Sequence, residues 1–111
     1  MVNYNKLNDL VNIAIEDLEK YVSNYEDGIK SNSTNDTLKV LKKLKKVAVS
    51  QTKLETYLIQ SIHDISVGAV KEYNGTSLES SILNIRRFFK ENIEGFDGYS
   101  LLGMNFNKYF N

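Results

Sequence analysis

The residues best able to do chemistry in this sequence are lysines that crowd into a short stretch of its middle third. One set comprises Lys39, Lys42, Lys43 and Lys46, and Lys45 and Lys53 lie beside it. Lys39 precedes Lys42 and Lys43 by three and four residues, and Lys46 follows them by four and three, so a helix places all of them on one broad face. Such a face is typical of a solvated surface, alone or paired with acids of the first helix, or of an electrostatic patch for phosphate or an acidic protein. Because lysines steer partners from a distance, a patch predicts salt-sensitive association.

Catalytic chemistry has little support in the residues. The single histidine, His63, precedes Asp64, and adjacent residues on a helix point about 100° apart, so Asp64 is poorly placed to orient it as in a catalytic triad. A structural or surface histidine is therefore favoured. Ser50, Thr52 and Ser66 have no obvious base, and the chain lacks a phosphate-binding glycine loop and a nucleophile elbow. We predict that the protein is not an enzyme.

A metal centre is also disfavoured. Glu16 and Glu19 can share a helix face, but a dimetal bundle needs carboxylates from several helices together with Glu-x-x-His motifs, which the sequence lacks. The sequence contains no cysteine, so thiolate sites and disulfides are excluded. We predict neither a metal nor a cofactor, and we interpret the acids as solvated surface.

The chain length and the amino-acid composition indicate one folded domain over residues 1–111. Hydrophobic residues make up 41% of the chain and charged residues 25%, which is the composition of a globular protein with a single core. Residues 1–6 lack the apolar region of a secretory signal, and no run of 18 apolar residues occurs. These features predict a soluble, cytoplasmic protein that does not insert into a membrane.

The net charge is zero, but the charge is unevenly distributed. Residues 1–29 sum to −4, residues 30–53 to +6 and residues 54–111 to −2. A neutral total argues against a dedicated nucleic-acid binder, which usually carries a basic excess over the whole domain. A local basic patch remains compatible with these sums.

Apolar periodicity predicts helices along most of the chain. The predicted stripe of the first helix is Leu7, Leu10, Val11, Ala14, Leu18, Tyr21, Val22 and Tyr25, and that of the last is Leu78, Ile82, Leu83, Ile85, Phe88 and Phe89. The first helix is expected from a cap at Asn3 or Asn5 to about Tyr25, with Gly28 as the stop. A polar linker follows, and Thr34 or Asn35 caps a helical stretch over residues 36–73, which contains no proline. Its stripe of Leu38, Leu41, Leu44, Val47 and Ala48 lies opposite the lysines.

Residues 50–52 interrupt that stretch, and Thr52 and Glu55 have the spacing of a capping box. The pattern leaves open whether residues 36–73 form one kinked helix or two. The second half is predicted to be the central, most buried helix, through Leu54, Tyr57, Leu58, Ser61, Ile62, Ile65, Val67, Ala69 and Val70. A further capping box at Thr76 and Glu79 opens the last helix, which ends before Gly95. Its Arg86 and Arg87 extend the lysine patch only if the two helices lie side by side.

Residues 95–110 differ in kind, because they combine three glycines with several aromatic residues. They are interpreted as a lid that closes the bundle or as a contact surface, since Tyr and Phe are enriched in interface cores. No alternation typical of a strand appears. The predicted fold is all-α, an antiparallel bundle of four or five helices with an aromatic, glycine-containing C-terminal segment.

The helical pattern, the small size, the uneven charge and residues 95–110 together resemble the immunity proteins of contact-dependent growth inhibition and related polymorphic toxin systems. The resemblance covers that segment and the general helical organisation, and it carries over no functional residue. It implies a cytoplasmic inhibitor that forms a heterodimer with a cognate toxin domain, often a nuclease. Nuclease inhibitors are often strongly acidic, whereas this chain is neutral; Asp64, Glu72, Glu91, Glu94, Asp97 or the acids of the first helix offer local acidic faces.

Three functional hypotheses follow. The first is a toxin-neutralising immunity protein, the second a small nucleic-acid-associated regulator that uses the lysine face, and the third a self-associating structural or phage accessory bundle. Nucleic acid is the less favoured partner because the net charge is zero. The candidate partner-binding residues are Lys39, Lys42, Lys43, Lys46, Phe96, Asp97, Tyr99, Phe106 and Tyr109.

Overall fold

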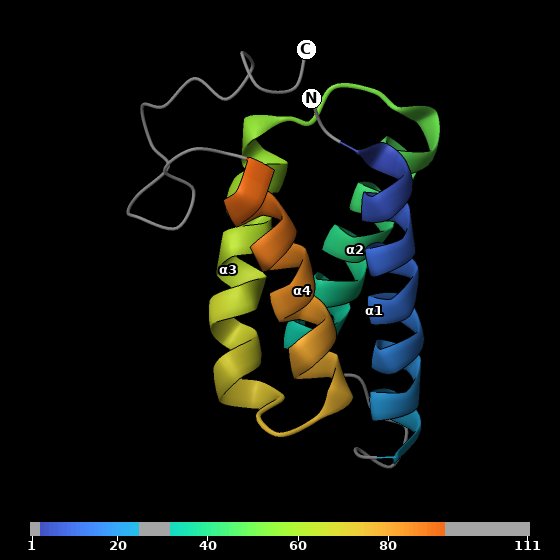
Figure 1. Ribbon diagram of the computed structural model, residues 1–111. Helices are drawn as coiled ribbons and strands as arrows, with labels where there is room; N and C mark the ends of the chain where they lie inside the picture. Colours follow the sequence, from blue (N-terminus) through green and yellow to red (C-terminus); the bar gives the residue numbers. More distant parts are fainter. Residues whose placement is uncertain (1–2, 25–31, 93–111) are drawn as a thin grey trace.

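The computed structural model describes residues 3–24 and 32–92, which fold into an antiparallel helical bundle (Figure 1). Its elements are α1 (Tyr4–Asn24), α2 (Asn32–Ser50), α3 (Thr56–Glu72) and α4 (Ser77–Asn92). α1 packs mainly against α2 and α4, while α3 packs against α4 and, less extensively, against α2. The all-α prediction is confirmed, with four helices and no strand in the described ranges. The C-terminal segment predicted for residues 95–110 lies outside them.

Each helix contributes one apolar stripe to a single core. On α1 the stripe is Leu7, Val11, Ala14 and Leu18, and on α4 it is Leu78, Ile82, Ile85, Phe88 and Phe89. Spacings of three and four residues keep such side chains on one side of a helix, where each large one contributes roughly 1.5–3 kcal/mol through burial. The stripes predicted for the first and last helices therefore form the core, and charged residues are left on the outer surfaces.

The start of α1 follows the predicted cap. The Asn3 side-chain oxygen accepts a hydrogen bond from the Lys6 backbone N–H at 3.0 Å, which satisfies a donor that the first turn leaves free. The helix extends through Asn24, and its predicted end near Tyr25 lies outside the described residues. Gly28, the predicted stop, lies outside the described residues.

Residues 36–73 form two helices rather than one kinked helix. α2 begins at Asn32, four residues before the predicted start, and ends at Ser50. The Thr52 N–H then donates to the Val47 carbonyl at 3.3 Å, while Gln51 adopts a left-handed conformation with φ 54°. This is the hydrogen-bond pattern of a Schellman motif, in which the residue after the helix turns the chain away.

The two predicted capping boxes have different outcomes. Thr52 does not cap α3, because α3 begins at Thr56 with Glu55 as its N-cap and no capping side-chain bond. The backbone of Thr52 is still completing the end of α2, so its position is unsuitable for opening the next helix.

The box at the start of α4 is confirmed at its cap, Thr76. Its reciprocal bond reaches the residue before the cap, because the Thr76 N–H donates to the Tyr73 carbonyl. The Thr76 hydroxyl accepts from the Glu79 N–H at 3.3 Å, and the Glu79 carboxylate accepts from the Gly75 N–H at 3.0 Å. Gly75 lies in the left-handed region with φ 82°, a conformation that glycine adopts at low cost. The connection between α3 and α4 is therefore closed by local bonds that its sequence encodes.

The prediction that the second half of residues 36–73 is the most buried helix is wrong. Leu58, Ile62 and Ala69 are buried as expected, but Tyr57, Val67 and Val70 are exposed. Among the described helices, α3 packs mainly against α4 and α2, so the 3.6-residue period buries one stripe and leaves other apolar residues exposed.

Polar contacts at one end of the bundle tie the helices together. The rings of Tyr21 on α1 and Tyr73 at the end of α3 pack edge to face with centroids 4.9 Å apart. The Tyr73 hydroxyl lies 3.5 Å from the Thr37 hydroxyl of α2. One turn before Tyr21 on α1, the Asp17 carboxylate accepts a hydrogen bond from the buried Ser81 hydroxyl of α4. α1, α2, α3 and α4 are thus all joined near this end.

Candidate interaction surface

The lysine face, defined as Lys39, Lys42, Lys43 and Lys46, lies on the outer surface of α2, where all four side chains are exposed. The opposite side of the same helix carries the buried residues Thr34, Thr37, Leu41, Leu44 and Ala48. The amphipathic pattern of α2 thus positions both surfaces at once, since burial of the apolar stripe forces the lysines outward. The structure brings together these four predicted site residues, and Lys45 is exposed as well.

The predicted alternative, that the acids of the first helix pair with these lysines, is not observed. Within residues 3–24 and 32–92, no carboxylate lies in ion-pair range of the lysine face. Lys39 and Lys43 are four residues apart, as are Lys42 and Lys46, and like charges at this spacing cost about 0.2–0.5 kcal/mol per pair. The fold gains no stability from this concentration of charge.

One aromatic side chain borders the lysine face. The Lys43 ammonium lies 5.5 Å from the centroid of the Tyr57 ring, which comes from the first turns of α3. Tyr57 is 56% exposed, so its ring offers apolar area beside a row of positive charges. A cation over an aromatic face at an exposed site contributes about 0.5–1 kcal/mol. Tyrosine is among the residue types enriched in the cores of protein interfaces.

The sequence interpretation placed Tyr57 in the core and so missed it as a surface residue. The signal lay in the spacing, because Tyr57 falls off the stripe made by Leu58, Ile62, Ser66 and Ala69. Its contact with Lys43 depends on how α3 lies against α2, which periodicity within one helix does not encode.

The arginines of α4 do not extend the lysine face. α4 packs against α1 and α3 and has no extensive contact with α2. The Arg86 guanidinium reaches inward, donating to the Ser66 hydroxyl at 3.3 Å, and that hydroxyl donates to the His63 carbonyl at 2.7 Å. Arg86 therefore joins α4 to α3. The exposed Arg87 lines a separate cleft with Lys6 of α1, away from the lysine face.

The remaining predicted partner-binding residues cannot be placed on this surface. Phe96, Asp97, Tyr99, Phe106 and Tyr109 lie outside the described residues.

His63 and Asp64, the pair considered for catalysis, lie side by side on α3 without forming a catalytic arrangement among the described residues. Asp64 is exposed and accepts a hydrogen bond from the Gln60 side chain at 3.1 Å, which lies one turn earlier on α3. His63 is half-buried beside it. In the ranges that the structure describes, no group of three or more His, Cys, Asp or Glu side chains is arranged to hold a metal ion. Nor does any helix there have the length and apolar character needed to cross a membrane.

Comparison with known proteins identifies no relative. The chain matches no protein family, and neither the curated proteins nor the solved structures include a significant match.

Proposed function

We propose that the protein is a non-catalytic inhibitor that binds a cognate bacterial toxin domain through the lysine face of α2. The observation that supports binding is the set of four exposed lysines with no carboxylate partner in the described residues. Their mutual repulsion opposes folding, so their concentration on one helix calls for a different explanation. The class of partner, a toxin delivered by a competing cell, comes from the resemblance to immunity proteins.

The net charge of the chain and the exposed Tyr57 ring favour a protein partner over nucleic acid. The chain is neutral overall, whereas nucleic-acid-binding domains usually carry a strong positive excess. Tyr57 adds aromatic area beside Lys43, a combination suited to the core and rim of a protein interface. The lysines would accelerate the encounter with an acidic surface, and the apolar contacts would slow dissociation.

The test begins with the protein purified from its native cell together with whatever binds it. The expected partner is the C-terminal region of a large secreted protein whose reading frame lies beside this one. Expressed alone, that region should arrest growth, and coexpression of this protein should restore it. Recovery of nucleic acid that high salt removes, or of a homo-oligomer with no other component, would contradict the proposal.

A charge-reversal pair then tests the surface. Lys42→Glu combined with Lys46→Glu should lower the association rate constant by roughly tenfold or more at low salt and weaken its salt dependence. The matched control, Lys20→Glu combined with Lys71→Glu, makes the same change in net charge at exposed positions on α1 and α3. Equal losses in both variants would indicate a general charge effect and reject the α2 face as the binding site.

A further inference from the structure

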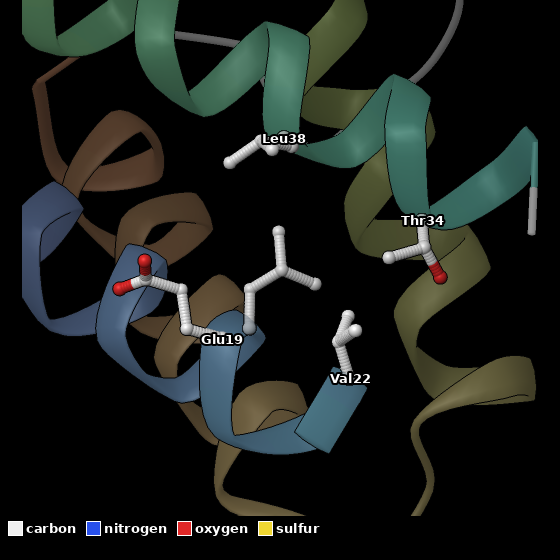
Figure 2. Close-up of a pocket in the computed structure, with 5 residues that line it drawn as sticks. Glu19, Val22, Thr34 and Leu38 are labelled. Carbon is white, nitrogen blue, oxygen red and sulfur yellow. The ribbon is translucent and has the colours of Figure 1, made fainter. Parts of the chain in front are cut away.

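An apolar pocket opens between the end of α1 and the start of α2. It is lined by Leu18, Glu19 and Val22 from α1 and by Thr34 and Leu38 from α2. Figure 2 shows Thr34 and Leu38 projecting from α2 and Val22 projecting from α1 toward the same gap, with the Glu19 carboxylate at the side away from Thr34. The lining surface is mostly hydrocarbon, so the pocket favours an apolar occupant.

The size of the pocket limits what fits. Its volume is about 200 Å³, below the roughly 300–1,000 Å³ of typical small-molecule and cofactor sites. An apolar cavity of about 150 Å³ accepts benzene, so this one has room for a single aliphatic or aromatic side chain. A buried side chain of that kind is the usual anchor of a protein interface.

The flank of α2 beside the pocket carries two lysines, so it is complementary to an acidic partner. Lys42 and Lys45 follow Leu38 by four and seven residues, so both lie on the same side of the helix as the pocket. Val49 follows Leu38 by eleven residues, about 16 Å along the axis, and is 63% exposed. Two ammonium groups therefore lie between an apolar pocket and an exposed apolar side chain.

The other flank of α2 has the opposite character. A cleft between α2 and α3 is lined by Asp36 and Asp64 together with Ile65 and Gly68. Its carboxylates repel an acidic partner that the lysine face attracts. Of these two cavities beside α2, the pocket between α1 and α2 suits an acidic partner better, because its lining carries one carboxylate, Glu19, at one side rather than two.

We infer that this pocket receives one apolar side chain from an acidic helical segment of the protein partner. This inference rests on the proposed function and specifies the chemistry of the partner. The segment carries a leucine or phenylalanine as its anchor and acidic residues four and seven positions away, which lie against Lys42 and Lys45. No acid of the segment lies beside Glu19, because two carboxylates would repel each other there. The lysines supply encounter rate, and the anchor supplies residence time.

The first experiment uses a defined probe, a synthetic helical peptide of roughly 16 residues with one Leu and with Glu four and seven residues after it. Titration should shift the methyl NMR signals of Leu18, Val22 and Leu38 in the wild-type protein. Replacing the peptide's Leu by Ala, or its two Glu by Lys, should weaken binding at least about tenfold. No binding at millimolar peptide, or shifts confined to other methyl groups, would overturn the inference.

The second experiment fills the pocket. Val22→Phe should weaken both the peptide and the native partner at least about tenfold, mainly through faster dissociation. Val67→Phe makes the same change at an exposed site of α3 and should leave both affinities unchanged. Circular dichroism and thermal unfolding establish that both variants are folded. Loss of self-association in Val22→Phe, with partner binding intact, would assign the pocket to a second copy of this chain and overturn the inference.

The two proposals can fail separately. If the Lys42→Glu and Lys46→Glu pair weakens the native partner while Val22→Phe does not, the lysine face stands and the anchor pocket is rejected. If Val22→Phe weakens the partner while the charge-reversal pair does not, the pocket still binds the partner, but the proposed role of the lysine face and the acidic character of the segment are both rejected.

Discussion

α2 and α4 are amphipathic helices of similar length, with 19 and 16 residues, but they use their outer surfaces differently. On α4, polar side chains serve the fold, since Glu79 completes the capping box and Arg86 reaches Ser66 on α3. On α2, the outer surface carries five lysines and one Asp, and no partner for the lysine face other than the Tyr57 ring is found in the described ranges. The polar side chains of α4 therefore stabilise the fold, whereas the lysine face adds nothing to it, which is the property that the proposed binding role requires.

The largest expected effect comes from the core side of α4. Phe89 is fully buried, so Phe89→Ala should lower the free energy of unfolding by about 3–5 kcal/mol through lost burial and the cavity left behind. Urea unfolding measures the change. The control, Tyr57→Ala beside the lysine face, should cost less than about 1 kcal/mol, since that ring is mostly in solvent. Comparable losses would show that the surface beside α2 also supports the fold.

The start of α4 gives the next effect. Thr76→Ala removes the hydroxyl that accepts from the Glu79 N–H and should lower the free energy of unfolding by about 1 kcal/mol. Thr52→Ala at the other predicted capping box should cost only a few tenths of a kcal/mol, because its exposed hydroxyl caps no helix. Thermal or urea unfolding of the two variants separates a real cap from a sequence coincidence.

A substitution just after the end of α2 should raise the free energy of unfolding rather than lower it. Gln51→Gly relieves a left-handed conformation that costs a non-glycine residue about 1–2 kcal/mol, while it adds about 0.4–1 kcal/mol of chain entropy to the unfolded state. The expected outcome is a net stabilisation of about 0.5 kcal/mol. Glu55→Gly, at an ordinary φ of −71°, should destabilise in the same unfolding measurement. Stabilisation by both would point to a cause other than backbone strain.

Alkaline pH tests the hydrogen bond between α1 and the connection that joins α2 to α3. Burial raises the pKa of the Tyr4 phenol, whose hydroxyl donates to the Thr52 carbonyl at 3.1 Å. The folded state thus keeps this proton at a pH at which the unfolded chain has lost it. Its contribution to stability is complete below about pH 10 and falls as pH rises through the folded-state pKa. Tyr4→Phe should remove this component from the pH dependence of unfolding, and an unchanged profile would contradict it.

The smallest effect on stability is expected at the lysine face. Lys42→Glu with Lys46→Glu replaces repulsion by attraction to Lys39 and Lys43, each three residues earlier. The free energy of unfolding should stay the same or rise by up to about 0.5 kcal/mol, as measured by urea unfolding. A loss above about 1 kcal/mol would mean that these lysines support the fold, and the contrast between α2 and α4 would disappear.

The sequence alone determined the class of fold and much of its local detail. The three- and four-residue spacing of apolar side chains identified the stripes of α1 and α4, and short-range bonds made the Asn3 cap and the Thr76 capping box predictable. The lysine face was predictable for the same reason, because a periodic charge pattern within one helix fixes which side faces solvent.

Only the tertiary structure decided what depends on neighbouring helices. Thr52 had the spacing of a cap, but the closing turn of α2 occupies its backbone. Tyr57 and Val67 had the character of core residues, but the position of α3 in the bundle leaves them exposed. The contact of Tyr57 with Lys43 and the pocket between Val22 and Leu38 likewise join residues far apart in the chain. Periodicity fixes which side of a helix is apolar, whereas packing of one helix on another decides what that side meets.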